Sequence, residues 1–395
     1  MVALVVVAGA AAAYEAAARQ RDYAEALTRG DAALRDDQTF GAIEAYSGAI
    51  ALRPDSMLAY LRRGQTYQRR GDRGDLEAAA RDFRTAALLD PTATRPLEAL
   101  GDALYQLQRF ERAEEAYERC LHLDDRSARV TYRLALARYR RRNIDAALAA
   151  LGDAVRLDDR VAEAHYLRGI CLREQRRLPE AIRALDRALA LDPTLLPARE
   201  ELADLYGAMD RHNEQLEQLQ LLASLERENP ARQVAVGLAH ARAGHWDRAV
   251  LTLGDAIERN PDQPEFYRAL GQVWLERPRD DRAFLSKAHE ALERAASGQS
   301  ATSESLVLYA RALLQEEDVD GAEHALQQAT TRYPIDSQAF LLYATTAERQ
   351  NHLEAARQAL IDYQAIASAE AKSATASLIS ALSQRLAARA AAIKK

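Results

Sequence analysis

Residues 161–194 read VAEAHYLRGICLREQRRLPEAIRALDRALALDPT, and this stretch decides the fold of the chain. Apolar residues recur three and four positions apart in two runs, 164–172 and 181–191, which predicts two amphipathic helices. Pro193 lies just beyond the second run and predicts where that helix ends. Two helices this short cannot bury their apolar faces alone, so they need copies of themselves on either side.

Such copies are present as columns of matching residues along the chain. From Gly101 to Gly271 a small residue of the first helix returns every 34 residues. Small residues let two helix backbones approach, and one large apolar residue per copy fills the groove beside them. The small column contains Gly30, Gly64, Gly101, Ala135, Gly169, Ala203, Gly237, Gly271, Ala310 and Ala344. The large column contains Tyr46, Phe83, Tyr117, Leu151, Leu185, Leu219, Leu253, Leu292, Leu326 and Leu360.

These columns and their spacing resemble the tetratricopeptide repeat. About ten repeats would cover residues 23–370, after an apolar helix at 1–22 and before a capping helix at 371–395. The resemblance implies an all-α fold, a right-handed solenoid of about ten antiparallel helix pairs whose first helices line the concave face. It also implies a non-catalytic scaffold or adaptor that binds a protein or peptide along that face.

The composition fits a folded repeat protein and favours no nucleic-acid partner. The chain has 395 residues, of which 48% are hydrophobic, and a net charge of -6. That balance is too apolar for a disordered chain, and the acidic total does not favour binding to nucleic acid. The two cysteines, Cys120 and Cys171, fall in different repeats, so we expect small buried side chains and no disulfide between them.

A search for catalytic motifs gives no candidate enzyme site. No glycine precedes a lysine, which excludes a phosphate-binding P-loop, and there is no G-x-S-x-G or H-E-x-x-H motif. The nearest histidines, His240 and His245, are five residues apart and do not share a helix face. Acidic pairs such as Asp124 and Asp125 fall at helix ends, where turn formation explains them. We therefore expect no enzyme activity, no metal and no cofactor.

The apolar run VALVVVAGAAAA at residues 2–13 differs from the rest of the chain. It is shorter than the roughly 17 to 25 residues that span a bilayer, and it lacks a basic segment before it. Three interpretations stay open: the end of a membrane anchor, a degenerate signal sequence, or a cap on the first repeat. The first interpretation would make the chain a membrane-anchored regulatory or assembly subunit of a bacterial envelope, secretion or polysaccharide machine. The localisation therefore also stays open: it is either cytoplasmic, or membrane-associated and periplasmic.

Three segments depart from the regular repeat. In the sixth repeat, Gln215 and Leu222 replace small residues, which predicts either compensation nearby or a joint with wider spacing to the seventh repeat. Residues 277–281 add a five-residue insertion to the eighth repeat. The tail carries an apolar stripe that predicts the capping helix, formed by Leu378, Ile379, Leu382, Leu386 and Ile393.

The resemblance also places particular first-helix residues on the concave face. Residues 126–177 hold 13 Arg against six Asp and Glu, a local +7, so we expect a positive surface rich in Arg and Tyr. Such a surface suits an acidic partner segment with apolar anchors. The candidate peptide-binding residues are Arg69, Arg95, Asp102, Tyr105, Arg129, Tyr132, Leu136, Tyr139, Arg140, Tyr166, Ile170 and Arg173. The oligomeric state is not predicted.

Overall fold

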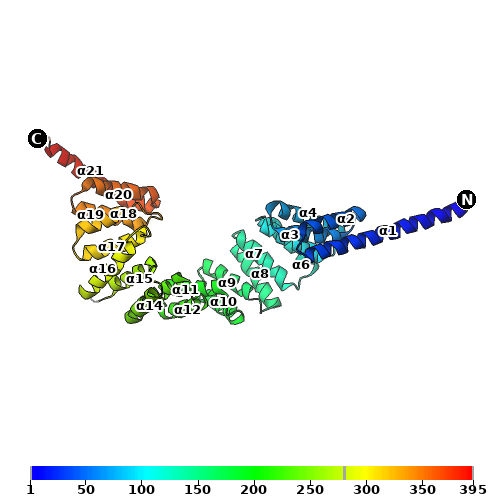
Figure 1. Cartoon of the computed structure of the whole chain (residues 1–395), viewed down its shortest axis with the longest axis horizontal. Helices are drawn as coiled ribbons and strands as arrows, with labels where there is room; N and C mark the ends of the chain where they lie inside the picture. Colours follow the sequence, from blue (N-terminus) through cyan, green and yellow to red (C-terminus); the bar gives the residue numbers. More distant parts are fainter. Residues whose placement is uncertain (1, 279–281, 394–395) are drawn as a thin grey trace. The chain divides into compact units, whose positions relative to one another are not determined.

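The computed structural model describes residues 2–278 and 282–393, which form 21 helices joined by short turns (Figure 1). Side chains are described at all of these positions except 2–12, 369–371, 374, 389–391 and 393. No strand occurs in this part of the chain, so the expected all-α helical repeat solenoid is confirmed. Residues 279–281 of the predicted insertion lie outside the described residues.

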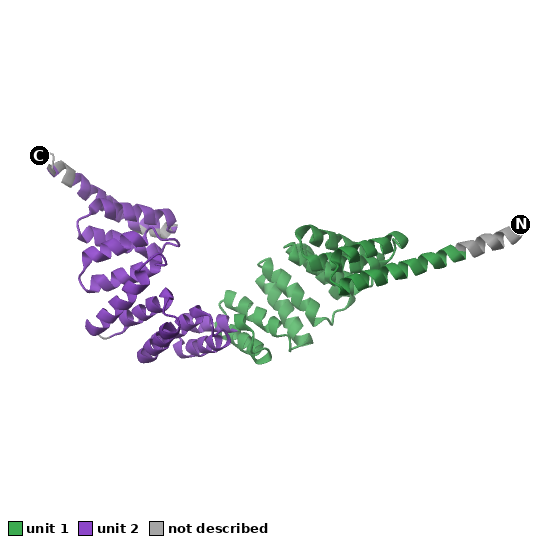
Figure 2. Cartoon of the chain, in the orientation of Figure 1, with its two compact units in different colours: residues 1–198 green, residues 199–395 purple. Residues whose placement is uncertain are grey.

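The chain divides into two compact units, residues 1–198 and 199–395, which are coloured separately in Figure 2. In the first unit each repeat contributes two antiparallel helices, and successive helices pack side by side. Its helices are α1 (Val2–Arg35), α2 (Thr39–Leu52), α3 (Met57–Arg70), α4 (Arg73–Leu89), α5 (Thr94–Gln106), α6 (Phe110–Leu123), α7 (Ala128–Arg140), α8 (Ile144–Leu157), α9 (Ala162–Glu174) and α10 (Leu178–Leu191).

The second unit repeats the same arrangement. Helix α11 begins three residues before the division between the two units. The helices are α11 (Leu196–Ala208), α12 (His212–Leu225), α13 (Pro230–Arg242), α14 (Trp246–Arg259), α15 (Pro264–Glu276), α16 (Arg282–Ala296), α17 (Ser303–Gln315), α18 (Val319–Ala329), α19 (Ser337–Arg349), α20 (Leu353–Ile366) and α21 (Ala369–Ile393).

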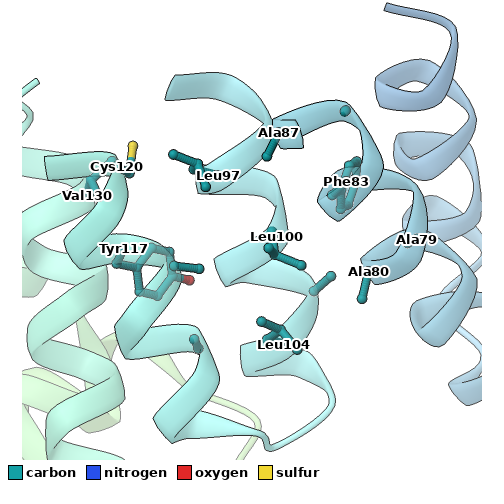
Figure 3. Close-up of a cluster of buried hydrophobic side chains, with 14 of the residues drawn as sticks. Ala79, Ala80, Phe83, Ala87, Leu97, Leu100, Leu104, Tyr117, Cys120 and Val130 are labelled. Atoms are coloured by element: carbon teal, nitrogen blue, oxygen red, sulfur yellow. The ribbon is translucent and has the colours of Figure 1, made fainter. Parts of the chain in front are cut away.

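The core of each repeat is the contact between the small and the large columns. Figure 3 shows this core around α4, α5 and α6, where Phe83 and Tyr117 are buried among leucine and alanine side chains. A methyl group added at Gly64 would lie 2.6 Å from Cε1 of Phe83, closer than packed carbon atoms approach. All three aromatic residues of the large column, Tyr46, Phe83 and Tyr117, face a glycine. The wider ring therefore requires the smaller residue opposite it.

The turns inside most repeats share one backbone form, from which the second repeat departs with a positive φ at Gly71, directly after α3. The residue two positions after the end of the repeat's first helix has a positive φ, as at Gln108 (φ 60°) and Arg142 (φ 64°). The amide of Gln108 donates to the carbonyl of Tyr105 at 2.9 Å, and the amide of Arg109 donates to Leu104 at 2.8 Å. These bonds satisfy carbonyls at the end of α5, and they hold the turn residues in the same place in successive repeats.

The two ends of the chain are helical. Helix α1 continues without a break from the apolar run into the first repeat, and its residues 13–22 are exposed except Ala18, which is half-buried. The interpretation as a packed cap therefore finds no support at residues 13–22, and the side chains of 2–12 lie outside the described ones. None of the described helices is both long enough and apolar enough to cross a membrane.

At the carboxyl end, α21 covers the last repeat with part of the predicted stripe. Leu382 is buried, and Ile379 and Leu386 pack against the same cluster as Leu360 of α20. Leu378 is 53% exposed and so is not part of the contact, while the side chain of Ile393 lies outside the described ones. The stripe is therefore narrower than the sequence suggested.

The sixth repeat accommodates its two exceptions differently. Leu222 is fully buried, whereas the amide of Gln215 packs against Gly207. A methyl group at Gly207 would lie 2.5 Å from Nε2 of Gln215, so the glycine provides the room that the larger side chain needs. Gly207 therefore compensates for the volume of Gln215, but the amide oxygen of Gln215 has no hydrogen-bond partner among the described residues. The wider spacing to the seventh repeat stays a prediction.

Candidate functional site

Side chains of α5, α7 and α9 contact one another across one face of the first unit. Arg129 of α7 lies 2.9 Å from the carboxylate of Glu98 on α5. Arg140 of α7 donates from Nε to the hydroxyl of Tyr105 on α5, at 3.0 Å. Tyr139 of α7 donates to Glu174 of α9 at 2.8 Å. Because each bond joins successive first helices, these predicted residues lie on a shared surface.

Asp102 also lies between these helices, but its two bonds give it a structural role. Its carboxylate accepts a hydrogen bond from Tyr117 at 2.7 Å and is 2.5 Å from Arg133. Burial raises the pKa of Asp102, an effect that the bonds from Tyr117 and Arg133 partly offset. Asp31, Tyr46 and Arg62 repeat the same triad at the amino-terminal end. Asp102 therefore joins two repeats, and we no longer count it among the candidate peptide-binding residues.

Tyrosine side chains form a row over the same three helices. Tyr132 is half-buried against the core of its repeat, as is Tyr139. Burial, followed by the charge of Glu163 and the neighbouring Tyr105 and Tyr166, raises the pKa of Tyr132 to about 12. The pKa of Tyr139 is also raised to about 12, mainly by burial and then by Glu174. The rings of Tyr132 and Tyr139 are therefore neutral phenols at physiological pH, suited to packing and hydrogen bonding.

A cavity of about 550 Å³ opens where α5 and α7 end. The rings of Tyr105 and Phe110 meet edge to face at one side, with centroids 5.2 Å apart. Arg140 and Arg142 lie on the α7 side. The lining residues are Tyr105, Gln106, Gln108, Phe110, Tyr139, Arg140 and Arg142, and none of them carries a carboxylate.

The other predicted residues are distributed less favourably. Arg69 belongs to the second repeat, where it pairs with Asp37 at 2.8 Å and lies apart from the cavity. Ile170 is only 6% exposed, because it packs into the core, and so it offers a ligand almost no surface. Leu136 packs partly against the core between α7 and α9. Arg95 is exposed at the start of α5, and Arg173 is half-buried near the end of α9.

The local charge of +7 is largely balanced by residues outside the window in which it was counted. Arg133 contacts both Glu98 and Asp102, and Arg141 contacts both Glu111 and Glu114. Counting within one segment missed these partners, because they lie one repeat earlier in the sequence. The expectation of a broadly positive surface is therefore corrected to a smaller positive area. Arginines of the segment that pair with acids outside it include Arg129, Arg133, Arg138, Arg141 and Arg177, whereas Arg142 and Arg156 pair with acids inside it.

Several residues of the site were not predicted from the sequence, among them Gln106 and Gln108, which also line the cavity. Phe110 begins α6 and forms a wall of the cavity, and Arg142 lies in the turn that follows α7. Arg133 bridges the two acids of α5. Its signal was a spacing of 31 residues to Asp102, which is close to one repeat and brings successive first helices together.

The remaining sequence predictions concern the two cysteines, a metal site and the acidic pairs at helix ends. Cys120 and Cys171 are unpaired and buried, as expected, and burial raises the pKa of Cys120 to about 11. In the described part of the chain no three His, Cys, Asp or Glu side chains are grouped as a metal site would require. Asp124 accepts the amide of Arg126 at 3.1 Å, which confirms its predicted role in a turn.

Comparisons with known proteins give the family. Models of the tetratricopeptide repeat match residues 95–127, 132–195, 235–301 and 308–372. Small glutamine-rich tetratricopeptide repeat-containing protein 2 of Mycosarcoma maydis is 30% identical over 95 residues, which are 24% of this chain and 26% of that relative. The matched segment thus spans about a quarter of either protein.

Solved structures give two further likenesses. Yeast Tom70 is 14% identical with a TM-score of 0.47, over 93% of this chain and 97% of Tom70. YrrB, described as a TPR protein with an unusual peptide-binding site, is 21% identical with a TM-score of 0.40. That match covers 48% of this chain and 95% of YrrB.

Proposed function

We propose that this chain, which belongs to the tetratricopeptide repeat family, binds a segment of a partner protein across the face of α5, α7 and α9. Proteins of this family generally act as protein-interaction scaffolds and are typically non-catalytic. The observation that carries the proposal is the row of half-exposed tyrosines on successive first helices, Tyr105, Tyr132, Tyr139 and Tyr166.

The energetics of interfaces support this choice of face. Tyrosine and arginine are enriched among residues that dominate binding energy, because each buries a large surface and keeps a polar tip. The tyrosines here are already ordered by core packing and by hydrogen bonds such as that of Tyr139 to Glu174. A partner would therefore pay little to immobilise them.

The ion pairs between the helices contribute order more than attraction. Arg129 and Arg133 share Glu98, so they hold α5 and α7 in register and leave little net charge for a ligand. The partner segment should therefore be recognised mainly by apolar side chains that pack between tyrosine rings. It would lie extended or helical across the three helices.

The test starts from peptides selected for binding to the full chain from a random 12-residue phage display library. Affinity is then measured with a double variant, Tyr105→Ala with Arg129→Ala, on the proposed face. We expect a loss of roughly tenfold or more, equivalent to about 1.4 kcal/mol. Thermal melting of the variant shows whether the fold is kept.

A matched control lies on the other helix of the same repeat. Glu115 and Arg119 are exposed on α6, and Glu115→Ala with Arg119→Ala removes two side chains of similar size. This control should bind the peptides as the parent does. Equal binding by the parent and the Tyr105 and Arg129 variant would show that the partner binds elsewhere.

A further inference from the structure

The cavity at the ends of α5 and α7 contains an arginine with no acidic partner. The three consecutive residues Arg140, Arg141 and Arg142 differ sharply in this respect. Arg141 contacts the carboxylates of Glu111 and Glu114, and Arg142 lies 3.5 Å from Glu174. Arg140 contacts no carboxylate among the described residues, and its Nε donates to the phenol of Tyr105.

The bond to Tyr105 orients the guanidinium of Arg140. With Nε occupied at 3.0 Å, the two terminal nitrogens remain as donors on the edge of the group away from that phenol. The bond also raises the pKa of Arg140, which keeps the side chain charged. An oriented arginine loses less entropy on binding a carboxylate than a mobile one.

The surroundings of Arg140 combine positive charge with an apolar wall. Arg142 is held in its turn by a backbone bond to Tyr139, and its side chain is 80% exposed. Tyr105 and Phe110 form an aromatic corner at the opposite side of the cavity. Arg141, by comparison, lines the adjacent cavity of about 600 Å³ together with Glu111. That adjacent cavity also contains Arg109 and Arg112, so it is positive too, but Glu111 lines it and Arg109 pairs with Glu77. The first cavity is lined by no carboxylate, and the bond to Tyr105 already orients its Arg140.

We infer that this cavity holds the carboxylate of an aspartate or glutamate side chain in the partner segment, with a neighbouring apolar side chain against Phe110. The inference rests on the proposed function, because the segment is the one that crosses α5, α7 and α9. An internal side chain is favoured because Tyr105 and Tyr139 belong both to the cavity and to the row, so the segment continues past it. Arg140 makes the ionic contact, and Tyr105 positions it.

The experiment uses the selected peptides as amidated synthetic segments, so that no terminal carboxylate is present. We expect an aspartate or glutamate beside an aromatic or aliphatic residue in the selected set. Replacing that acid by its amide should weaken binding to the parent chain roughly tenfold, the range of a charge-assisted hydrogen bond. The same replacement should change binding to the Arg140→Gln variant less than about twofold, because the contact is already absent.

Arg141→Gln is the matched control. It removes the same charge from the next residue in the chain, whose side chain already contacts two glutamates. It should bind the parent peptide normally. Tyr105→Phe keeps the ring but frees Arg140, and it should give a smaller loss than Arg140→Gln. Melting curves of all three variants show whether they remain folded.

Each result has a defined meaning. Peptides that need no acid, or that lose equal affinity in Arg140→Gln and Arg141→Gln, would overturn the carboxylate site while leaving the proposed face intact. Peptides that bind only with a free carboxyl terminus would also overturn it. A library that yields no binder at all would count against both the site and the proposed function.

Discussion

The repeats from α5 to α10 and the helices α12 to α14 keep similar spacing in sequence, yet they satisfy their buried polar groups very differently. In the first region Asp102 has two partners, and His165 lies 3.0 Å from the carbonyl of Asp159. In the second, four buried atoms have no partner among the described residues: Nδ1 of His212, His240 and His245, and Oε1 of Gln215.

The difference shows that repeat spacing alone does not determine local stability. Each buried polar group without a partner costs about 1–3 kcal/mol, which is a large fraction of the net free energy of unfolding of a domain. Since each repeat in a solenoid contacts only its neighbours, such costs stay local. We therefore expect α12–α14 to open more readily than α5–α10, and we place recognition on the more ordered region.

The largest expected loss of stability comes from disrupting the close contact between α9 and α10. In Gly169→Leu the new side chain must occupy space taken by Leu185, whose Cγ would lie 2.6 Å from an added methyl group. We expect a loss of about 3 kcal/mol in the free energy of unfolding, measured by urea denaturation. Gly152→Leu is the control, because nothing lies within 4 Å of a methyl group added there. Equal stability of both variants would show that the glycine column is not a packing requirement.

The next prediction compares two buried polar residues directly. Asp102→Leu leaves Tyr117 without its acceptor and Arg133 with Glu98 as its one remaining acid, and it should destabilise the chain by about 2 kcal/mol. Gln215→Met removes an amide whose oxygen has no partner and keeps the volume, so it should be neutral or stabilise by about 1 kcal/mol. Urea denaturation measures both changes. Destabilisation of similar size in the two variants would remove the distinction between the regions.

The smallest effect is a dependence on pH. Burial lowers the pKa of His240, and the nearby His245 and Arg248 lower it further. The unfolded chain then binds a proton more readily than the folded one, so stability falls as pH drops below about 6.5 and levels off below the folded pKa. Burial also lowers the pKa of His165, but its contact with Asp159 opposes the shift.

Hydrogen exchange between pH 7.5 and 5.5 measures the loss of stability in each helix separately. It should be larger in α13 and α14 than in α9, and His240→Gln should reduce it. An equal loss in α9, or one unchanged by His240→Gln, would assign the acid sensitivity to other groups.

The sequence predicted the fold because the fold depends on residue size at fixed spacing. Tyr117 and Gly101 could be paired in this way, since a ring and a missing side chain complement one another wherever the repeat continues. Ile170 could not be placed correctly, because one position in a first helix can face either the core or the groove. The exposed charge was also overestimated, since Arg133 finds its acids one repeat earlier.

Cavities were beyond prediction for a related reason. The cavity at Arg140 depends on where Phe110 begins the next helix and on the direction in which Tyr105 holds the guanidinium. The sequence identified Tyr105, Tyr139 and Arg140 as residues of one face, but it could not show that Arg141 contacts two glutamates while Arg140 contacts none among the described residues. That distinction follows from the contacts of each side chain.

Hydrogen exchange of the full chain, with and without a selected acidic peptide, tests the proposed binding surface most directly. Without peptide, amides of α12–α14 should exchange faster than those of α5–α10. With peptide, new protection should appear at the ends of α5 and α7 and in the turns that contain Gln108 and Arg142, and it should be weaker in Arg140→Gln at the same peptide concentration. Protection confined to other helices would contradict a partner site at this surface, whereas equal protection in Arg140→Gln would contradict only the ionic contact of Arg140.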